Sequence, residues 1–596
     1  RYPNNNEFHN IDGRTYENYY RSWIYHNILG NYTYLFIEDM AGIQPRSDEK
    51  IELSPIDFSY DHFMVNNVRY HGHDLTVVWD KPDDGKTWYN ECPEGYSLYI
   101  DGTLAFTLKD LAHVVYDSAT KEISFPDGAV EIVTNNGGAA IPTAMNTAIT
   151  EEKVLNMLEK SGVHGMTNLA EGAEVTATFT PDNKLVYAIT NLGRDKSALV
   201  LMDPATCEEL EQLYTNDKYD LGGLWYSDAQ KKLLGVSYEG HKGKTRYFFD
   251  KATEEMLGRM ERHLRGYEIG IGGSNKAEDK YIVYAGGDRT MGAYYFYDVK
   301  SDTMTKLADL APWIDEQQMA EMTPVTYTSR DGLEIEGYLT LPVGKTLHNA
   351  KNLPVVVNPH GGPWARDSWG FNPEVQFLAN RGYAVLQMNF RGSTGFGRKF
   401  TEIAYGKWGQ TMQDDITDGV NWLIEKGIAD PSKIAIYGGS YGGYATLQGI
   451  VKDPDLYACA VDYVGVSNLF SFLQTIPPYW KPMLDMMYEM VGNPEKDAQM
   501  LRENSPALNA ERIKTPLLVV QGANDPRVNI NESNQMVDAL RKRGVHVDYM
   551  VKDNEGHGFH NEENRFDFYR AMEKFLGKYL KGIEPEGEIV PESSRR

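Results

Sequence analysis

The stretch that decides the fold is "IAIYGGSYGGY", residues 434–444, in which four glycines surround Ser440 directly after a run of apolar, β-prone residues. Gly438-x-Ser440-x-Gly442 fits a nucleophile elbow, a sharp strand-to-helix turn that raises the serine hydroxyl above the edge of a sheet. Glycines relieve the crowding at such a turn. A bare G-x-S-x-G occurs by chance in roughly one chain in five of this length. The motif alone therefore leaves a second interpretation, a glycine-rich loop without a catalytic role.

Strand-like and helix-like segments alternate on both sides of the elbow. A hairpin that turns at Asp331-Gly332 comes first, and a helix with one apolar face over 563–580 comes last. Short apolar, β-rich runs lie between them at 353–359, 383–390, 433–439, 458–464, 516–522 and 545–551. This alternation predicts a mostly parallel sheet with helices on both faces. The fold class predicted for residues 323–582 is an α/β-hydrolase with a doubly wound sheet.

The elbow requires a base and an orienting acid later in the chain, in the order Ser, Asp, His. Asp525 follows the strand-like "PLLVVQGAN", and His557 follows "YMVKDNEG". The predicted catalytic residues are therefore Ser440 as nucleophile, His557 as base and Asp525 as the acid that orients the imidazole. Asp553 and Glu555 are rival carboxylates near His557, and we expect them to be solvated loop charges.

Acyl transfer also needs N–H donors for the oxyanion that develops on the substrate. "NPHGGPW" (358–364) directly follows a predicted strand, and its glycines allow a close backbone approach. The predicted oxyanion hole consists of the N–H groups of Gly362 and Tyr441, while a tight Gly-Pro turn is the alternative for the first segment. This chemistry requires no metal and no organic cofactor.

An internal repeat precedes the hydrolase segment. Paired strand-like runs end at Asp203, Asp250 and Asp298, which are 47 and 48 residues apart. Propeller blades have a similar period. Residues 182–322 are therefore predicted to form a partial β-propeller of about three blades. Such an open ring exposes strand edges and favours self-association.

The N-terminal part does not continue this repeat. Residues 1–167 are predicted to be a β-rich module, with a hairpin at 97–108, a strand at 69–80 and a short helix at 151–162. Residues 168–181 are predicted to be a junction, and residues 583–596 a flexible tail. His71 and His73 form an H-x-H pair, but a third ligand is lacking, so no metal site is predicted.

Four motifs in order resemble the prolyl oligopeptidase family of serine peptidases, nearest to its acylaminoacyl-peptidase-like branch. They are "NPHGGPWARDSWGFNPEVQFLANRGYAVLQMNFRGSTGFG", "YGGSYGGYA", "QGANDPRVN" and "NEGHGF". The resemblance covers about 180–580 and implies a propeller before an α/β-hydrolase domain. It also implies that Arg527 contacts the substrate backbone. The double-glutamate helix of the dipeptidyl-peptidase branch is not evident, which disfavours dipeptidyl specificity.

The N-terminal module carries two other resemblances. Residues 1–167 resemble the C-terminal β-sandwich of bacterial helical-barrel glycoside hydrolases. "NLAEGAEVTATFT" (168–180) resembles the start of a discoidin-like carbohydrate-binding domain. These resemblances imply a join near residues 179–182, either natural or an artefact of assembly.

Composition excludes several classes of function. A net charge of −26 disfavours nucleic-acid binding, which depends on cationic side chains. No apolar run reaches 18 residues, so no membrane span is predicted. The three cysteines are far apart and predict neither a disulfide framework nor a zinc site. The chain opens with "RYPNNNEFHN", which indicates a fragment or a processed chain and leaves the compartment open.

The predicted function is a serine peptidase that cleaves short peptides through an acyl-enzyme. The same machinery accepts ester and amide carbonyls, so a carboxylesterase is the first alternative. A carbohydrate-binding or structural chimera with an inert hydrolase part is the second, because of residues 1–180.

Overall fold

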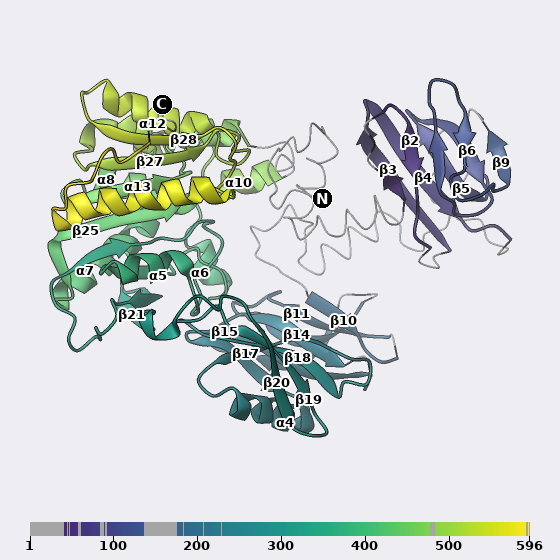
Figure 1. Cartoon of the computed structure of the whole chain (residues 1–596), viewed down its shortest axis with the longest axis horizontal. Helices are drawn as coiled ribbons and strands as arrows, with labels where there is room; N and C mark the ends of the chain where they lie inside the picture. The colour runs from purple at the N-terminus through teal and green to yellow at the C-terminus, as the bar shows by residue number, and fades with distance from the viewer. Residues whose placement is uncertain are drawn as a thin grey trace. The chain divides into compact units, whose positions relative to one another are not determined.

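The fold is described from a computed structural model of the 596-residue chain. The structure describes residues 41–135, 176–476, 483–591 and 594, with gaps at 45, 47, 58–60, 84–88, 90–91, 183, 205, 207 and 228. The chain divides into two compact units, Arg1–Val154 and Leu155–Arg596. Each unit is described by itself (Figure 1).

The described part of the first unit contains two antiparallel sheets. One has the strand order β3-β4-β5-β6-β9 and the other β1-β2-β7-β8. Tyr96, Leu98 and Phe106 are fully buried in its core. The strands are β1 (Ile43–Gln44), β2 (Ile51–Leu53), β3 (His62–Tyr70), β4 (His73–Asp80), β5 (Gly95–Ile100), β6 (Thr103–Leu108), β7 (Val114–Tyr116), β8 (Ile123–Ser124) and β9 (Ile132–Asn135).

The hairpin predicted at 97–108 is confirmed as β5 and β6. The single strand predicted at 69–80 is wrong, because the chain reverses at His71 and Gly72, both with positive φ, between β3 and β4. His73 lies next to Asp101, with its Nδ1 at 2.6 Å from the carboxylate. The helix predicted at 151–162 lies outside the described residues.

The described part of the second unit begins with three antiparallel sheets, as the repeat predicts. Their strand orders are β10-β11-β12-β13, β14-β15-β16 and β17-β18-β19-β20. The strands are β10 (Thr176–Phe179), β11 (Val186–Thr190), β12 (Ala198–Asp203), β13 (Glu208–Thr215), β14 (Leu221–Ser227), β15 (Lys232–Gly240), β16 (Gly243–Phe248), β17 (Glu268–Ser274), β18 (Lys280–Gly286), β19 (Ala293–Asp298) and β20 (Thr303–Asp309).

Two details differ from the predicted repeat. Strand β10 lies within the predicted junction 168–181, yet it pairs with β11 and is the first strand of its sheet. The second sheet has three strands and is followed by helix α4 (Lys251–His263). Asp250 caps this helix, because its carboxylate accepts from the Thr253 N–H at 2.8 Å. The aspartate that marks the repeat therefore begins a helix at this blade.

An eight-stranded sheet forms the rest of the second unit, in the order β21-β22-β24-β23-β25-β26-β27-β28. The pairs from β24 to β28 along this order are parallel, while β21 and β22 form the predicted antiparallel hairpin. The strands are β21 (Met322–Thr328), β22 (Glu334–Thr340), β23 (Leu353–Val357), β24 (Ala384–Met388), β25 (Ala429–Gly439), β26 (Cys459–Tyr463), β27 (Leu517–Gly522) and β28 (Val547–Lys552).

Helices cover both faces of this sheet. The α-helices are α5 (Pro373–Asn380), α6 (Arg398–Glu402), α7 (Thr411–Glu425), α8 (Tyr441–Lys452), α9 (Leu469–Gln474), α10 (Leu484–Met490), α11 (Ala498–Glu503), α12 (Ile530–Arg541) and α13 (Glu562–Lys581), and the 3₁₀ helices are η4 (Glu316–Gln318) and η6 (Pro506–Arg512). Helix α13, yellow in Figure 1, lies across β25, β26 and β27. The predicted α/β-hydrolase fold is confirmed.

Successive residues of the central strands point to opposite faces. Val355 and Val357 lie in the core beneath α7, α8 and α12, while Val356 lies in the core beneath α5 and α13. Ile589 and Val590 fall in the predicted flexible tail, but they are buried in the second of these cores. The chain after α13 is therefore exposed at first and returns to the core at Ile589 and Val590.

Hydrogen bonds join the first two of the three sheets to the start of α6 in the hydrolase part. The Asp195 carboxylate accepts from the Lys399 N–H, and the Asp195 carbonyl accepts from the Arg398 N–H, both at 2.8 Å. The Asp220 carboxylate accepts from the Gly397 N–H at 2.8 Å. The start of α6 is therefore held by two aspartates of the first blades.

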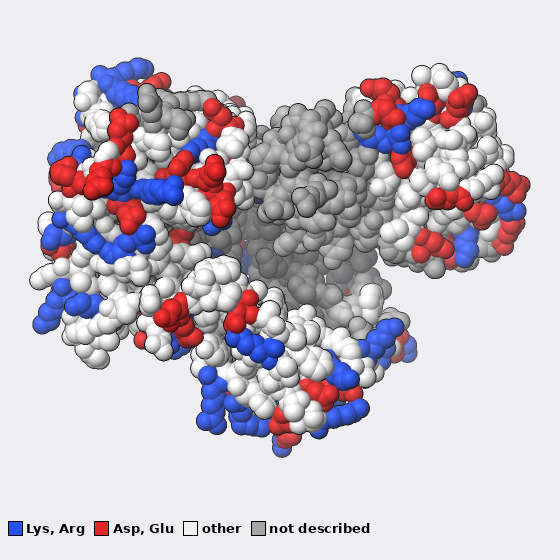
Figure 2. Space-filling view, in the orientation of Figure 1, with Lys and Arg blue, Asp and Glu red and all other residues white. Residues whose placement is uncertain are grey.

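Charges of both signs are mixed over the surface of the second unit. In the face drawn in Figure 2, Lys and Arg lie among Asp and Glu over the hydrolase part and over the three sheets. Across the residues that the structure describes, none of the helices has the length and apolar character needed to cross a bilayer.

Candidate active site

The turn between β25 and α8 has the geometry of a nucleophile elbow. Ser440 adopts φ 59° and ψ −118°, a region that non-glycine residues rarely occupy. A Cβ at Gly438 would lie 2.5 Å from the Gly442 carbonyl oxygen, and a Cβ at Gly442 would lie 2.2 Å from the Pro359 carbonyl oxygen. Both glycines of the motif are therefore required by close backbone approaches.

Ser440, His557 and Asp525 form a continuous hydrogen-bonded chain. The Ser440 Oγ lies 3.0 Å from His557 Nε2, and His557 Nδ1 lies 2.8 Å from Asp525 Oδ2. An ionised carboxylate can only accept, so Nδ1 carries the proton and Nε2 is free to accept one from Ser440. The Asp525 side chain is fully buried, and its other oxygen accepts from the N–H groups of Arg527 and Val528. The three predicted residues are thus brought together in the predicted order.

The segment after β23 lies beside Ser440. A Cβ at Gly361 would lie 3.5 Å from the Ser440 Cβ. Helix α8 begins at Tyr441, whose N–H is one of the first-turn donors that have no partner within a helix. Gly362 and Tyr441 line the same cavity as Ser440 and His557. This placement is compatible with the predicted pair of oxyanion donors.

The cavity at Ser440 has a volume of about 330 Å³ and is mostly apolar. Trp408 forms one wall and packs edge-on against the Tyr441 ring, with the centroids 4.6 Å apart. Arg527, the predicted substrate contact, also lines this cavity. The lining consists of Gly362, Trp364, Trp408, Ser440, Tyr441, Val466, Phe472, Met483, Met486, Met487, Arg527, Val528 and His557.

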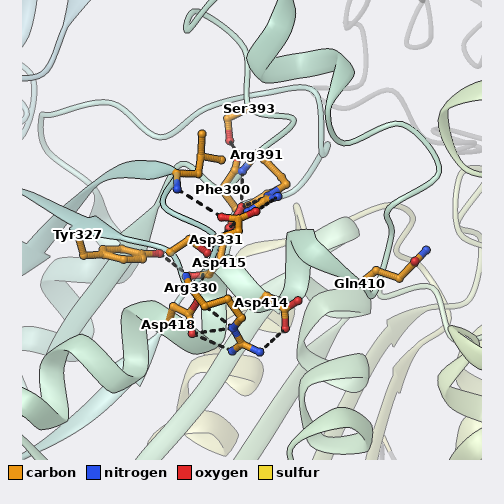
Figure 3. A network of polar contacts seen from close by, with 12 residues as sticks. Tyr327, Arg330, Asp331, Phe390, Arg391, Ser393, Gln410, Asp414, Asp415 and Asp418 are labelled. Atoms are coloured by element: carbon orange, nitrogen blue, oxygen red, sulfur yellow. Dashed lines mark hydrogen bonds and ion pairs between the residues drawn. The ribbon is translucent and has the colours of Figure 1, made fainter.

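An ionic network around the buried pair Arg391 and Asp415 supports the segment next to the elbow (Figure 3). Arg391 lies just after β24, and its guanidinium donates to both oxygens of Asp415 at 2.8 and 2.7 Å. It also donates to Asp331, in the turn of the first hairpin, at 2.8 Å. Burial raises the pKa of Asp415, and the Arg391 guanidinium opposes that rise. The neighbouring Phe390 packs against the Tyr441 ring at 5.4 Å.

A second cavity of about 470 Å³ adjoins the first, because Trp364 and Met486 line both. It lies between the first two blades and the hydrolase part, and its polar lining includes Asp220, Glu239 and Glu402. Asp220 and Glu402 are hydrogen-bonded to Gly397 and Arg398, respectively.

Glu239, on β15, differs from these two carboxylates. Among the described residues, its carboxylate has no hydrogen bond or ion pair. Burial, together with the nearby Glu268, raises its pKa, and the charges of Arg366 and Lys244 oppose that rise. No sequence motif marks Glu239, which lies near the end of β15, the middle strand of its sheet. Only the approach of β15 to the hydrolase part brings it to the cavity.

Glu555 also differs from its prediction. We expected a solvated loop charge, but its side chain is fully buried. Asp525, and not Glu555, accepts from His557.

Comparison with known proteins gives a consistent result. A model of the prolyl oligopeptidase family matches residues 369–582. Dipeptidyl aminopeptidase BIII of Pseudoxanthomonas mexicana is 39% identical over 423 residues, which are 70% of this chain and 61% of that protein. The acylamino-acid-releasing enzyme of Arabidopsis thaliana is 31% identical over 241 residues, 40% of this chain and 32% of that protein. The chain therefore spans less than two thirds of the length of these curated relatives.

The fold is shared with solved structures. The crystal structure of a puromycin hydrolase superposes with a TM-score of 0.60 at 20% sequence identity, over 90% of this chain and 72% of that one. At this identity the likeness shows the fold alone.

Proposed function

This chain contains a prolyl oligopeptidase family domain, and from that premise we propose that it is a serine peptidase that hydrolyses short peptides. The observation that carries the proposal is the chain from Ser440 Oγ through His557 to the buried Asp525, which opens on an apolar cavity. Ser440 attacks the scissile carbonyl while His557 takes its proton, and His557 then protonates the leaving amine. Water hydrolyses the resulting acyl-enzyme by the same route. The oxyanion is proposed to accept from the N–H groups of Gly362 and Tyr441.

The lining of the catalytic cavity specifies the first prediction. Peptide anilides with a large apolar residue at the scissile bond are expected to be cleaved about 10- to 100-fold more efficiently than those with aspartate or lysine there. An apolar side chain gains from burial among Phe472 and three methionines, whereas a charged one would lose its hydration in this mostly apolar cavity. The measurement is kcat/KM across a series of otherwise identical short anilides.

Aryl esters of the same acyl groups serve as the comparison. A peptidase should turn over the anilides with its preference intact, while an esterase would hydrolyse only the esters. Failure of a fluorophosphonate to label Ser440 would contradict both activities and favour a binding or structural role.

A finer proposal concerns the amino terminus of the substrate. Two observations favour a free α-amino group: the relative from P. mexicana is called an aminopeptidase, and Glu239, a half-buried carboxylate without a hydrogen bond among the described residues, lines the cavity beside the catalytic one. A peptide that extends from Ser440 into this second cavity would bring its α-ammonium towards Glu239. A half-buried carboxylate attracts an ammonium more strongly than an exposed one.

Glu239→Gln tests this proposal. The wild type should favour a free dipeptide anilide over its N-acetylated form by about 10- to 100-fold in kcat/KM, the range of a charge-assisted hydrogen bond. The variant should lose most of this preference through a higher KM for the free peptide, with the acetylated one unaffected. Glu402→Gln is the matched control, since that carboxylate lines the same cavity but pairs with Arg398. An unchanged preference in Glu239→Gln would contradict the role of Glu239.

A further inference from the structure

Glu555 lies in the loop that carries His557, between β28 and α13. Its side chain is fully buried, and among the described residues it has no ion pair. A buried carboxylate is costly unless N–H or O–H donors replace its hydration. The donors that surround Glu555 therefore show what it holds in place.

All of these donors come from the far side of His557. Glu555 Oε2 accepts from the His560 N–H at 2.9 Å. Glu555 Oε1 accepts from the Asn561 N–H at 2.9 Å, from the Asn561 Nδ2 at 2.9 Å and from the Asn564 Nδ2 at 2.7 Å. The carboxylate thus closes the loop 555–561 on itself, with His557 inside the closed segment.

The backbone of the same residue reaches the other member of the triad. Asn524 is the residue before Asp525, and its N–H donates to the Glu555 carbonyl at 2.9 Å. A Cβ at Gly522 would lie 2.1 Å from the Gly556 carbonyl oxygen, so the two loops are in direct backbone contact. Glu555 is therefore connected both to the loop of the base and to the loop of the orienting acid.

We propose, on the basis of the peptidase function above, that Glu555 is a positioning residue, which fixes the His557 loop so that the imidazole stands between Ser440 and Asp525. Among the described residues, no hydrogen bond joins the Glu555 side chain to His557. Glu555 acts instead through the backbone N–H groups of residues 560 and 561. A displacement of the imidazole of about 1 Å is expected to cost about 10²-fold in rate.

Glu555→Gln tests the proposal at nearly constant volume. Both carboxylate oxygens accept from N–H groups, so the glutamine amide must place its NH₂ against one of these donors. We expect kcat to fall by about 10²-fold with KM within about twofold of the wild type, because the substrate cavity has other walls. The rate of Ser440 labelling by a fluorophosphonate should fall by a similar factor. A merely structural defect would instead lower the fraction of active enzyme and leave the rate constants of the remainder unchanged.

Glu532→Gln is the matched control. Glu532, on α12, is equally buried and also accepts from two backbone N–H groups, those of Ser467 and Asn468, through one oxygen. Its other oxygen accepts from the Ser471 hydroxyl, which can reorient to donate elsewhere. None of these bonds reaches residues 555–561, so the variant should keep kcat within about threefold.

Asn564→Ala supplies a second, milder variant. It removes one donor to Glu555 from the first turn of α13, and we expect kcat to fall about three- to tenfold with KM unchanged. Equal kcat values in Glu555→Gln, Asn564→Ala and the wild type would overturn the proposal. If the wild type itself had no peptidase activity, the proposed function, and not the role of Glu555, would be contradicted.

Discussion

Alanine at Ser440 is expected to abolish nearly all hydrolysis, lowering kcat by about 10⁴- to 10⁶-fold for a short peptide anilide. His557→Ala should have an effect of the same order, because the hydroxyl is a poor nucleophile when no base lies 3.0 Å from its Oγ. The double variant should be scarcely worse than either single one, since the residues act as a unit. Single-turnover kinetics with purified, folded protein measures these factors.

The control is Ser432→Ala, an exposed serine at the other end of β25. It should leave kcat unchanged within error. Substantial anilide hydrolysis by Ser440→Ala would show that the nucleophile lies elsewhere and would overturn the assignment of the whole triad.

Methionine at Arg391 is expected to lower the free energy of unfolding of the hydrolase part by about 3–5 kcal/mol. Arg391 and Asp415 are both almost fully buried and share two charge-assisted hydrogen bonds. Without the guanidinium, Asp415 would keep only the backbone N–H of residue 391 and the Ser329 hydroxyl as donors. Urea unfolding monitored by tryptophan fluorescence measures the change.

A control variant and a compensating double variant test this prediction further. Arg330→Met removes an arginine of the same network whose side chain is half exposed, and should cost no more than about 1 kcal/mol. The double variant Arg391→Met with Asp415→Leu should recover much of the loss, because no buried charge is left unpaired. A double variant less stable than Arg391→Met would contradict this account.

The hydrolase fold was predictable because its signals are local. Each central strand is a short apolar run, and the elbow glycines at 438 and 442 mark a turn whose crowding demands them. The triad followed from residue order, since its members lie directly after strands. Strand ends in a parallel sheet meet at one edge, and this brings residues 440, 525 and 557 together.

Other features depend on tertiary contacts that no local pattern records. Glu555 has the sequence environment of a solvated loop, and only the fold of the loop surrounds it with N–H donors. Glu239 reaches a cavity only because its blade packs on the hydrolase part. Asp250 occupies the repeat position of a strand end, but its carboxylate serves equally well as a helix cap. A residue type that suits two roles does not decide between them from sequence.

The bonds that hold α6 to the blades have a consequence for how this chain tolerates change. Asp195 and Asp220 bind the N–H groups of residues 397, 398 and 399, so the hydrolase side of the contact contributes its main chain. Any non-proline residue supplies that donor. Substitution of the side chains at 398 and 399 should therefore spare these bonds, whereas the two aspartates admit no replacement that lacks a carboxylate or similar acceptor. The bonds at the start of α6 thus need side chains from the blades only, whereas a second contact between the two parts, from the Tyr219 hydroxyl to the Glu336 carboxylate at 2.9 Å, needs a side chain from each.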